Sequence, residues 1–140
     1  MSVRFYETIN DELLKFAVII AKHNGKYVFC KHKQRATLEV PGGHREAGEN
    51  IDDTARRELM EETGAIDFEI VSVCVYSVVS NDDCETESFG KLYFANVLSF
   101  EEELRSEMEY TVITDSLPTN WTYPTIQPIL LQEARRRGFI

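Results

Sequence analysis

The sequence predicts an α+β fold in which a mixed β-sheet lies between one helix in the middle of the chain and one at its end, an α/β/α sandwich. Strand-length apolar runs occur on both sides of a helical pattern at residues 50–63, and a second helical pattern occupies the C-terminus. The chain has 140 residues, of which 43% are hydrophobic, so we expect one domain, 1–140, with a sizeable core.

The first predicted strands form a hairpin. Residues 16–22 (FAVIIAK) are apolar over the length of a strand, and residues 26–30 (KYVFC) alternate polar and apolar side chains. Asn24-Gly25 lies between them, and this pair favours the two-residue turn of a β-hairpin. A shorter strand at residues 38–40 is expected to stop at Pro41-Gly42-Gly43.

The helix predicted over residues 50–63 carries signals at both ends. Asn50 is a good N-cap, and Asp52 and Asp53 place negative charge on the first turn. Gly64 is expected to end the helix in a left-handed conformation. Apolar residues recur at every fourth position and predict the buried face of the helix: Ile51, Ala55 and Leu59.

The second half of the chain returns to strand patterns and ends in a helix. The expected segments are one long or two short strands at 68–79, a polar loop at 81–88, a strand at 89–98, an acidic loop or short helical turn at 100–109, and a last strand at 110–113. Pro124 is predicted to open the C-terminal helix, which runs to about Arg137 and is closed by Gly138.

Composition excludes several functional classes. A net charge of −9 disfavours binding to a nucleic acid polymer, which requires a basic surface. The chain contains neither an apolar run of the ~20 residues that a membrane helix needs nor a signal-peptide pattern. The cysteines fit no zinc or disulfide spacing, so we expect small core residues in a reducing cytoplasm: Cys30, Cys74 and Cys84.

Three glutamates share the polar face of the helix at 50–63. Glu58, Glu61 and Glu62 are spaced i, i+3, i+4, so their carboxylates are expected to converge. Convergent carboxylates supply the hard oxygen ligands that Mg²⁺ or Mn²⁺ requires. Arg57 precedes Glu61 by four residues and can hold one carboxylate in place. Taken alone, this spacing is more typical of a solvated helix face, so the surrounding residues decide its meaning.

The complete spacing around these acids is specific. It runs Gly43, five residues, Glu49, seven residues, Arg57-Glu58-Leu59, one residue, Glu61-Glu62, one residue, Gly64-Ala65. At a background usage of about 0.06 for each fixed residue, a chance match is on the order of one in ten million. The segment resembles the 23-residue box of the Nudix hydrolases. Ala65 departs from the family, which usually has a larger aliphatic residue there, and this difference concerns packing under the helix.

The resemblance implies roles for the box residues and a Nudix-type α/β/α sandwich around a central box helix. The glutamates matching Glu58, Glu61 and Glu62 bind divalent cations in the family, here Mg²⁺ with Mn²⁺ as a substitute. The glutamate matching Glu49 supports the metal site, and the carbonyl matching Gly42 completes the coordination shell. The arginine matching Arg57 orients a catalytic glutamate.

The general base varies among members of the family, and two possibilities stay open. It can be the glutamate that matches Glu58, or an acid in a later loop. The later candidates are Glu103, Glu107 and Glu109, of which Glu107 is preferred. Each of these three is equally well explained as a solvated loop acid.

The resemblance implies hydrolysis of a diphosphate linkage in a small nucleotide-type substrate, by a monomer or a homodimer. The first candidate is a nucleoside triphosphate such as 8-oxo-dGTP; sugar nucleotides and dinucleoside polyphosphates remain alternatives. His44 and Arg35 are possible phosphate contacts. The aromatic residues are more typical of core than of a base-stacking platform: Phe5, Tyr6, Phe29, Tyr76, Phe89 and Trp121.

Three rival hypotheses are weaker. A non-catalytic Nudix module that senses nucleotides would be expected to lose some box glutamates, and this chain keeps all of them. A Nudix-fold isomerase of prenyl diphosphates would be longer and need further catalytic residues. A plain acidic interaction domain would show no dependence on Mg²⁺.

Overall fold

The computed structural model describes the backbone of residues 1–82, 84–102 and 108–140, and the side chains of these residues except 108–110. The strands are β1 (Ser2–Tyr6), β2 (Leu14–His23), β3 (Lys26–His32), β4 (Leu38–Glu39), β5 (Gly42–His44), β6 (Ala65–Val79), β7 (Glu87–Phe100) and β8 (Met108–Thr114). The helices are a short 3₁₀ turn, η1 (Asp11–Leu13), and two α-helices, α1 (Ile51–Thr63) and α2 (Gln127–Arg136).

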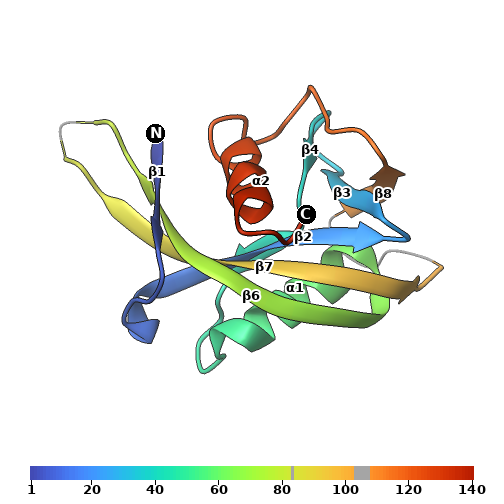
Figure 1. The fold of residues 1–140 in the computed structure, drawn as a ribbon, viewed down its shortest axis with the longest axis horizontal. Coiled ribbons are helices and arrows are strands. Elements are labelled where there is room, and N and C mark those ends of the chain that lie inside the picture. The colour runs from blue at the N-terminus through green and yellow to red at the C-terminus, as the bar shows by residue number, and fades with distance from the viewer. Residues whose placement is uncertain (83, 103–107) are drawn as a thin grey trace.

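The strands form a mixed sheet with the order β1-β6-β7-β2-β3-β4, to which β5 adds beside β2 and β8 beside β3. Strand β2 runs parallel to β7, while the hairpins β2–β3 and β6–β7 are antiparallel. Helices α1 and α2 lie on opposite sides of the strands (Figure 1). The α/β/α sandwich with a mixed sheet, a central helix and a C-terminal helix is thereby confirmed.

Each helix closes its own core against one face of the sheet. The predicted apolar face of α1 is buried to 3% exposure or less and packs on sheet residues that include Ile19, Ala95 and Val97. On the opposite face, Leu130 and Ala134 of α2 are fully buried in a cluster with sheet residues such as Phe29 and Leu92. Burial of apolar area in these two layers is the main force that holds the helices on the sheet.

The local signals around the hairpin and α1 are confirmed. Asn24 and Gly25 have φ of 50° and 78°, as a two-residue turn between β2 and β3 requires. The side chain of Asn50 accepts a hydrogen bond from the amide of Asp53 at 2.8 Å and so caps α1. At the other end, Gly64 has a φ of 74° and donates its amide to the carbonyl of Met60.

The strand predicted at 38–40 ends before the Pro-Gly-Gly segment, as expected, but the chain does not leave the sheet there, and the strand β5 that follows was not predicted. The chain turns at Pro41, whose carbonyl accepts from the amide of Ile19 at 2.9 Å, and continues as β5 along β2. Glycine permits this close pairing, because a Cβ at Gly42 would lie 2.6 Å from the carbonyl oxygen of Ala17. At this segment the chain therefore stops pairing with β3, as β4, and begins pairing with β2, as β5.

Other boundaries also differ from the prediction. The loop expected at 100–109 is shorter, since β7 continues to Phe100 and β8 begins at Met108. Helix α2 begins at Gln127, and Pro124 instead belongs to a turn in which the amides of Ile126 and Gln127 bond back to the carbonyl of Tyr123. Strand β1 was not predicted, because its five residues are too few for alternation to be informative.

The cysteine prediction holds for two of the three residues. Cys30 and Cys74 are buried and free, whereas Cys84 is exposed in the loop between β6 and β7. None of the helices in the described ranges is long and apolar enough to span a membrane.

Candidate active site

Arg57 on α1 is the centre of the polar network that follows β5. Its Nε and Nη2 donate to the two carboxylate oxygens of Glu49 at 2.8 and 3.0 Å, a bidentate pair. Its Nη1 donates to Glu58 at 2.7 Å and more weakly to Glu61 at 3.4 Å, and Nη2 also reaches the carbonyl of His44 at 3.0 Å. Arg57 therefore holds the loop before the helix, the end of β5 and the acidic face in one arrangement.

Glu49 is fixed in its ionised form. Besides the guanidinium of Arg57, its carboxylate accepts from the hydroxyl of Thr54 at 2.7 Å and from the amide of Glu46 at 3.2 Å. The hydrogen bonds from Arg57, followed by that from Thr54, lower the pKa of Glu49 to about 2. Glu49 thus acts as a permanently charged support for Arg57.

Glu58 lies directly against Gly43. A Cβ at Gly43 would be 2.3 Å from the carboxyl carbon of Glu58, so the space a side chain would need is filled by the carboxylate. The side chain of Glu58 is only 12% exposed. Burial raises its pKa, and the hydrogen bond and charge of Arg57 oppose that increase only in part.

Glu62 is the most deeply placed of the three helix acids. Its carboxylate accepts the backbone amide of Gly42 at 2.7 Å. Burial raises the pKa of Glu62 to about 8, with the charges of Glu58, Glu39 and Glu61 adding to the effect. Glu61, by contrast, has a side chain that is 53% exposed.

The three acids share a helix face but are turned to different partners. Glu58 faces Arg57 and Glu62 faces Gly42; in the portion of the chain that is described, no three acidic, histidine or cysteine side chains gather as a preformed metal cage. The predicted convergence on one point is therefore not reproduced. The donors still suit a divalent cation, because Mg²⁺ keeps several waters and needs only one or two carboxylates. A cation would also offset the burial that raises the pKa of Glu62 and the repulsion by neighbouring acids that adds to it.

The remaining predicted candidates divide into three groups. Glu103 and Glu107 fall outside the described residues, as does the side chain of Glu109. His44 lies in β5, not in a loop, and is exposed with its ring edge-on to Phe16. Arg35 contacts Glu39 and Tyr123 instead of standing alone.

The six aromatic candidates are confirmed as packing residues. Phe29 and Tyr76 are buried, at 0% and 2% exposure. The other four are partly buried and pack against the two cores: Phe5, Tyr6, Phe89 and Trp121. None of the six therefore stands out as a base-stacking platform.

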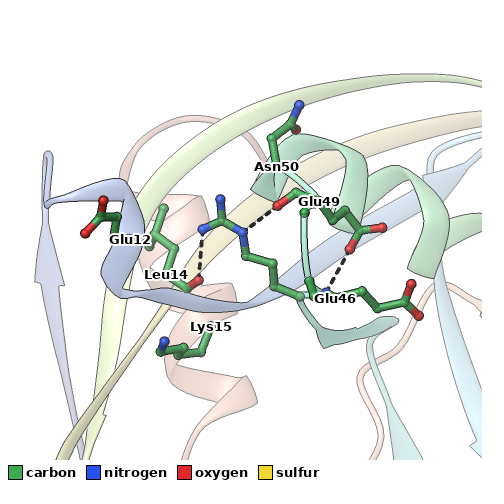
Figure 2. A pocket seen from close by; sticks show the side chains of 9 residues that line it. Glu12, Leu14, Lys15, Glu46, Glu49 and Asn50 are labelled. Carbon is green, nitrogen blue, oxygen red and sulfur yellow. Dashed lines mark hydrogen bonds between the residues drawn. The ribbon is translucent and has the colours of Figure 1, made fainter.

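Arg45 supports the site and was not predicted. It lines a hollow of about 530 Å³ beside residues 45–50 (Figure 2), where its Nε donates to the carbonyl of Glu49 at 2.7 Å and its Nη1 to those of Asp11 and Leu14 at 2.8 and 3.2 Å. The carboxylate of Glu49 extends away from Leu14 in Figure 2, and Arg57 is not among the residues that line this hollow. Only tertiary contacts reveal this role, since Arg45 occupies a variable position of the box.

Comparisons with known proteins agree with this site. The family described as NUDIX domain matches residues 13–117, which include every box residue. A relative from Bacillus subtilis (strain 168), YtkD, whose name ascribes to it an 8-oxo-dGTP diphosphatase activity, is 26% identical over 140 residues, covering 90% of this chain and 84% of the relative.

Solved structures show the same fold. A variant of the Bacillus subtilis pyrophosphohydrolase BsRppH superposes with a TM-score of 0.80 at 24% identity, covering 99% of this chain and 92% of that one. The Ap4A hydrolase of C. elegans, in a binary complex, gives a TM-score of 0.63 at 15% identity, covering 88% of this chain and 96% of that one. Because the family match spans most of the chain and the box acids are all present, the chain belongs to the Nudix family and is a hydrolase of phosphorus-containing acid anhydrides.

Proposed function

We propose that this Nudix hydrolase is a Mg²⁺-dependent pyrophosphohydrolase of nucleoside triphosphates, with an oxidised triphosphate such as 8-oxo-dGTP as the first candidate substrate. The observation that carries the proposal is the network in which Arg57 holds Glu49 and Glu58 beside Glu62. The similarity to YtkD supports the choice of substrate class.

In this proposal the helix acids hold the cation, which Mn²⁺ can replace. Glu58, Glu61 and Glu62 are the carboxylate ligands, the carbonyl of Gly42 is a further ligand, and Glu49 supports the site through Arg57. A bound divalent cation supplies a lowered pKa for water and compensation for charge on phosphoryl oxygens. Glu62 is partly buried, which reduces the screening of these charges by bulk water.

The general base is either Glu58 or an acid between β7 and β8, with Glu107 first among Glu103, Glu107 and Glu109. Burial raises the pKa of Glu58, which favours proton acceptance, while the hydrogen bond from Arg57 at 2.7 Å fixes the position of its carboxylate. Glu107→Gln separates the two, because Glu107 is not among the proposed metal ligands: a large loss of turnover with unchanged Mg²⁺ affinity would assign the base to Glu107, and unchanged turnover would leave Glu58 as the base.

Two alternatives remain for the same site. A dinucleoside polyphosphate or sugar-nucleotide hydrolase would use the same acids on a different linkage. A module that only senses nucleotides would not need two partly buried acids such as Glu58 and Glu62, whose pKa values are raised by burial, and burying ionisable groups without a function is costly.

The test is a substrate panel with Mg²⁺ in which the products are identified by phosphorus NMR. The panel contains 8-oxo-dGTP, dGTP, a dinucleoside tetraphosphate and a sugar nucleotide. We expect 8-oxo-dGTP to give a nucleoside monophosphate and pyrophosphate with the highest kcat/KM. Release of orthophosphate, or preference for one of the last two substrates, would replace the proposed substrate class, and no turnover of any nucleotide would overturn the enzyme proposal.

A further inference from the structure

We infer that Arg35 binds a phosphate group of the substrate and that Glu39 and Tyr123 hold its guanidinium in place for this contact. The inference rests on the proposed function insofar as it takes the substrate to be a nucleoside polyphosphate. Arg35 lies outside the box, in the connection between β3 and β4.

The sheet register places Arg35 beside the acidic face of α1. Glu39 on β4 is paired directly with Cys30 on β3, and side chains of directly paired residues point to the same side of a sheet. The thiol of Cys30 donates to the carbonyl of Glu62 at 3.6 Å, so this side faces the end of α1. Arg35 donates to Glu39 at 3.2 Å and therefore lies at the rim of the carboxylate site.

One edge of the Arg35 guanidinium is open. Its Nη1 donates to both Glu39 and the hydroxyl of Tyr123, each at 3.2 Å, and its Cζ lies 5.7 Å from the centre of the Tyr123 ring. Its Nε and Nη2 make no hydrogen bond with any residue in the described ranges, and the side chain is 44% exposed. The edge formed by Nε and Nη2 is the one that pairs with two oxygens of a phosphate.

Glu39 is buried at a cost that this role explains, and Tyr123 is held in place by backbone hydrogen bonds next to it. Glu39 is only 7% exposed and lies near other acids, and a buried carboxylate is destabilising unless it is paired. The residues just before Tyr123 are hydrogen-bonded to Leu38 of β4. The amide of Leu38 donates to the carbonyl of Asn120, and its carbonyl accepts from the amide of Thr122, each at 2.9 Å. Two separate parts of the chain thus fix the orientation of one exposed arginine.

The charge balance of the chain adds a further reason. With a net charge of −9 the protein repels a polyphosphate, and a fixed cation at the site would offset this repulsion together with any metal. Arg57 cannot serve, because its nitrogens already donate to Glu49, Glu58 and the carbonyl of His44. Within the part of the chain that the structure describes, Arg35 has the free donors that Arg57 lacks.

The test uses inorganic tripolyphosphate, which has phosphates but no base. Its affinity is measured by calorimetry, and its inhibition constant by competition with nucleotide hydrolysis. Arg35→Met should weaken tripolyphosphate binding and raise KM by about tenfold or more, the size expected for a lost charged hydrogen-bond pair, with kcat little changed. Arg35→Lys keeps a positive charge beside Glu39 but lacks the two parallel donors of the guanidinium. It should therefore restore only part of the tripolyphosphate affinity.

Arg4→Met is the matched control, because Arg4 is also an exposed arginine held by glutamates and lies on β1, away from the site. It should leave the tripolyphosphate affinity and KM unchanged. Unaltered tripolyphosphate affinity in Arg35→Met, an equal loss in Arg4→Met, or a fall in kcat at constant KM would overturn the inference. The calorimetric measurement needs no turnover, so failure of the proposed enzyme activity is detected separately.

Discussion

Gly43 shows how a single missing side chain can make room for a neighbouring carboxylate instead of serving turn geometry. Its φ is not in the left-handed region, yet the position a Cβ would occupy is taken by the carboxylate of Glu58. The carboxylate is the flexible end of a side chain, so it can move aside when a methyl group is added. The absence of a side chain at Gly43 therefore matters for where the carboxylate of Glu58 lies, and not for the path of the backbone.

Gly43→Ala should consequently keep the fold and lose activity. We expect the free energy of unfolding to change by less than about 1 kcal/mol, since a side-chain end gives way, while kcat falls at least tenfold because Glu58 is displaced. Urea unfolding and steady-state kinetics measure the two quantities. Full activity in this variant would show that the position of Glu58 does not matter.

Gly42→Ala should behave in the opposite way. Its Cβ would meet backbone, 2.6 Å from the carbonyl of Ala17 and 3.1 Å from the Cα of Val18, and neither atom can move without disturbing β2. We expect a destabilisation of about 2 kcal/mol or more, in the range typical of overpacking. A urea midpoint equal to that of the native protein would contradict the close approach of β5 to β2.

At the residue scale, the sequence predicted the acids of the site and their partner Arg57, but not the partners that lie outside the helix. Spacing along one helix identified Arg57, Glu58, Glu61 and Glu62, because neighbours in a helix follow from periodicity alone. Glu39 and Arg45 could not be found in this way, since their contacts depend on how strands and loops pack in three dimensions.

Helix α1 carries the site, so its ends must be well defined. Asn50 caps it with a hydrogen bond to the amide of Asp53 at 2.8 Å, and Tyr93 of β7 donates its hydroxyl to Asp52 in the first turn. Asn50→Ala should lower the free energy of unfolding by about 1 kcal/mol, the usual value of an N-cap. Chemical denaturation checks this value, with Asn81→Ala in an exposed loop as the control. Equal loss in both variants would argue against the cap.

An ion-pair cluster lies at the C-terminal end of helix α2, and its contribution to stability depends on pH. Glu133 accepts from Arg136 at 2.6 and 2.9 Å and from Arg137 at 2.8 Å, and these bonds, that of Arg136 first, lower the pKa of Glu133 to about 2 from an ordinary 4.5. The ionised form is therefore preferred in the native state. Its stabilisation is complete above pH 4.5 and is lost as the pH falls from about 4.5 to about 2.

Glu133→Gln should thus lower the melting temperature at pH 7 and flatten its decline between about pH 4.5 and 2. The control is Glu69→Gln, which alters an exposed glutamate of β6 that has no ion pair within the described ranges. Thermal unfolding followed at several pH values makes the comparison. Parallel pH profiles for Glu133→Gln and the native protein would exclude a role for this cluster.

At the scale of elements, sequence signals succeeded where the physics is local. The Asn24-Gly25 turn and both ends of α1 follow from caps and preferred φ values, and they were predicted within a residue. Strand β5 and the start of α2 at Gln127 were not, because they are set by pairing with β2 and by a turn at Tyr123. Such partners are distant in sequence and leave no local pattern.

The whole chain carries a net charge of −9, and several of its acidic residues lie together on helix α1. If the acids of α1 bind Mg²⁺, the ion should stabilise the folded state by linkage, by about 2.7 kcal/mol when its concentration is 100 times Kd. Thermal unfolding in Mg²⁺ and in EDTA at equal ionic strength measures this effect. We expect a higher melting temperature in Mg²⁺, reduced or absent in Glu62→Gln; equal melting temperatures in both buffers would argue against a metal site in the folded protein.

The central claim is that the acidic face of α1 performs metal-dependent hydrolysis of a phosphoanhydride. The most direct measurement is the turnover of Glu62→Gln with Mg²⁺ on the best nucleotide of the panel. Glutamine keeps the acceptor for the amide of Gly42, so the fold should be intact by circular dichroism. The account predicts a turnover lower by several orders of magnitude, and near-normal turnover in this variant would contradict it.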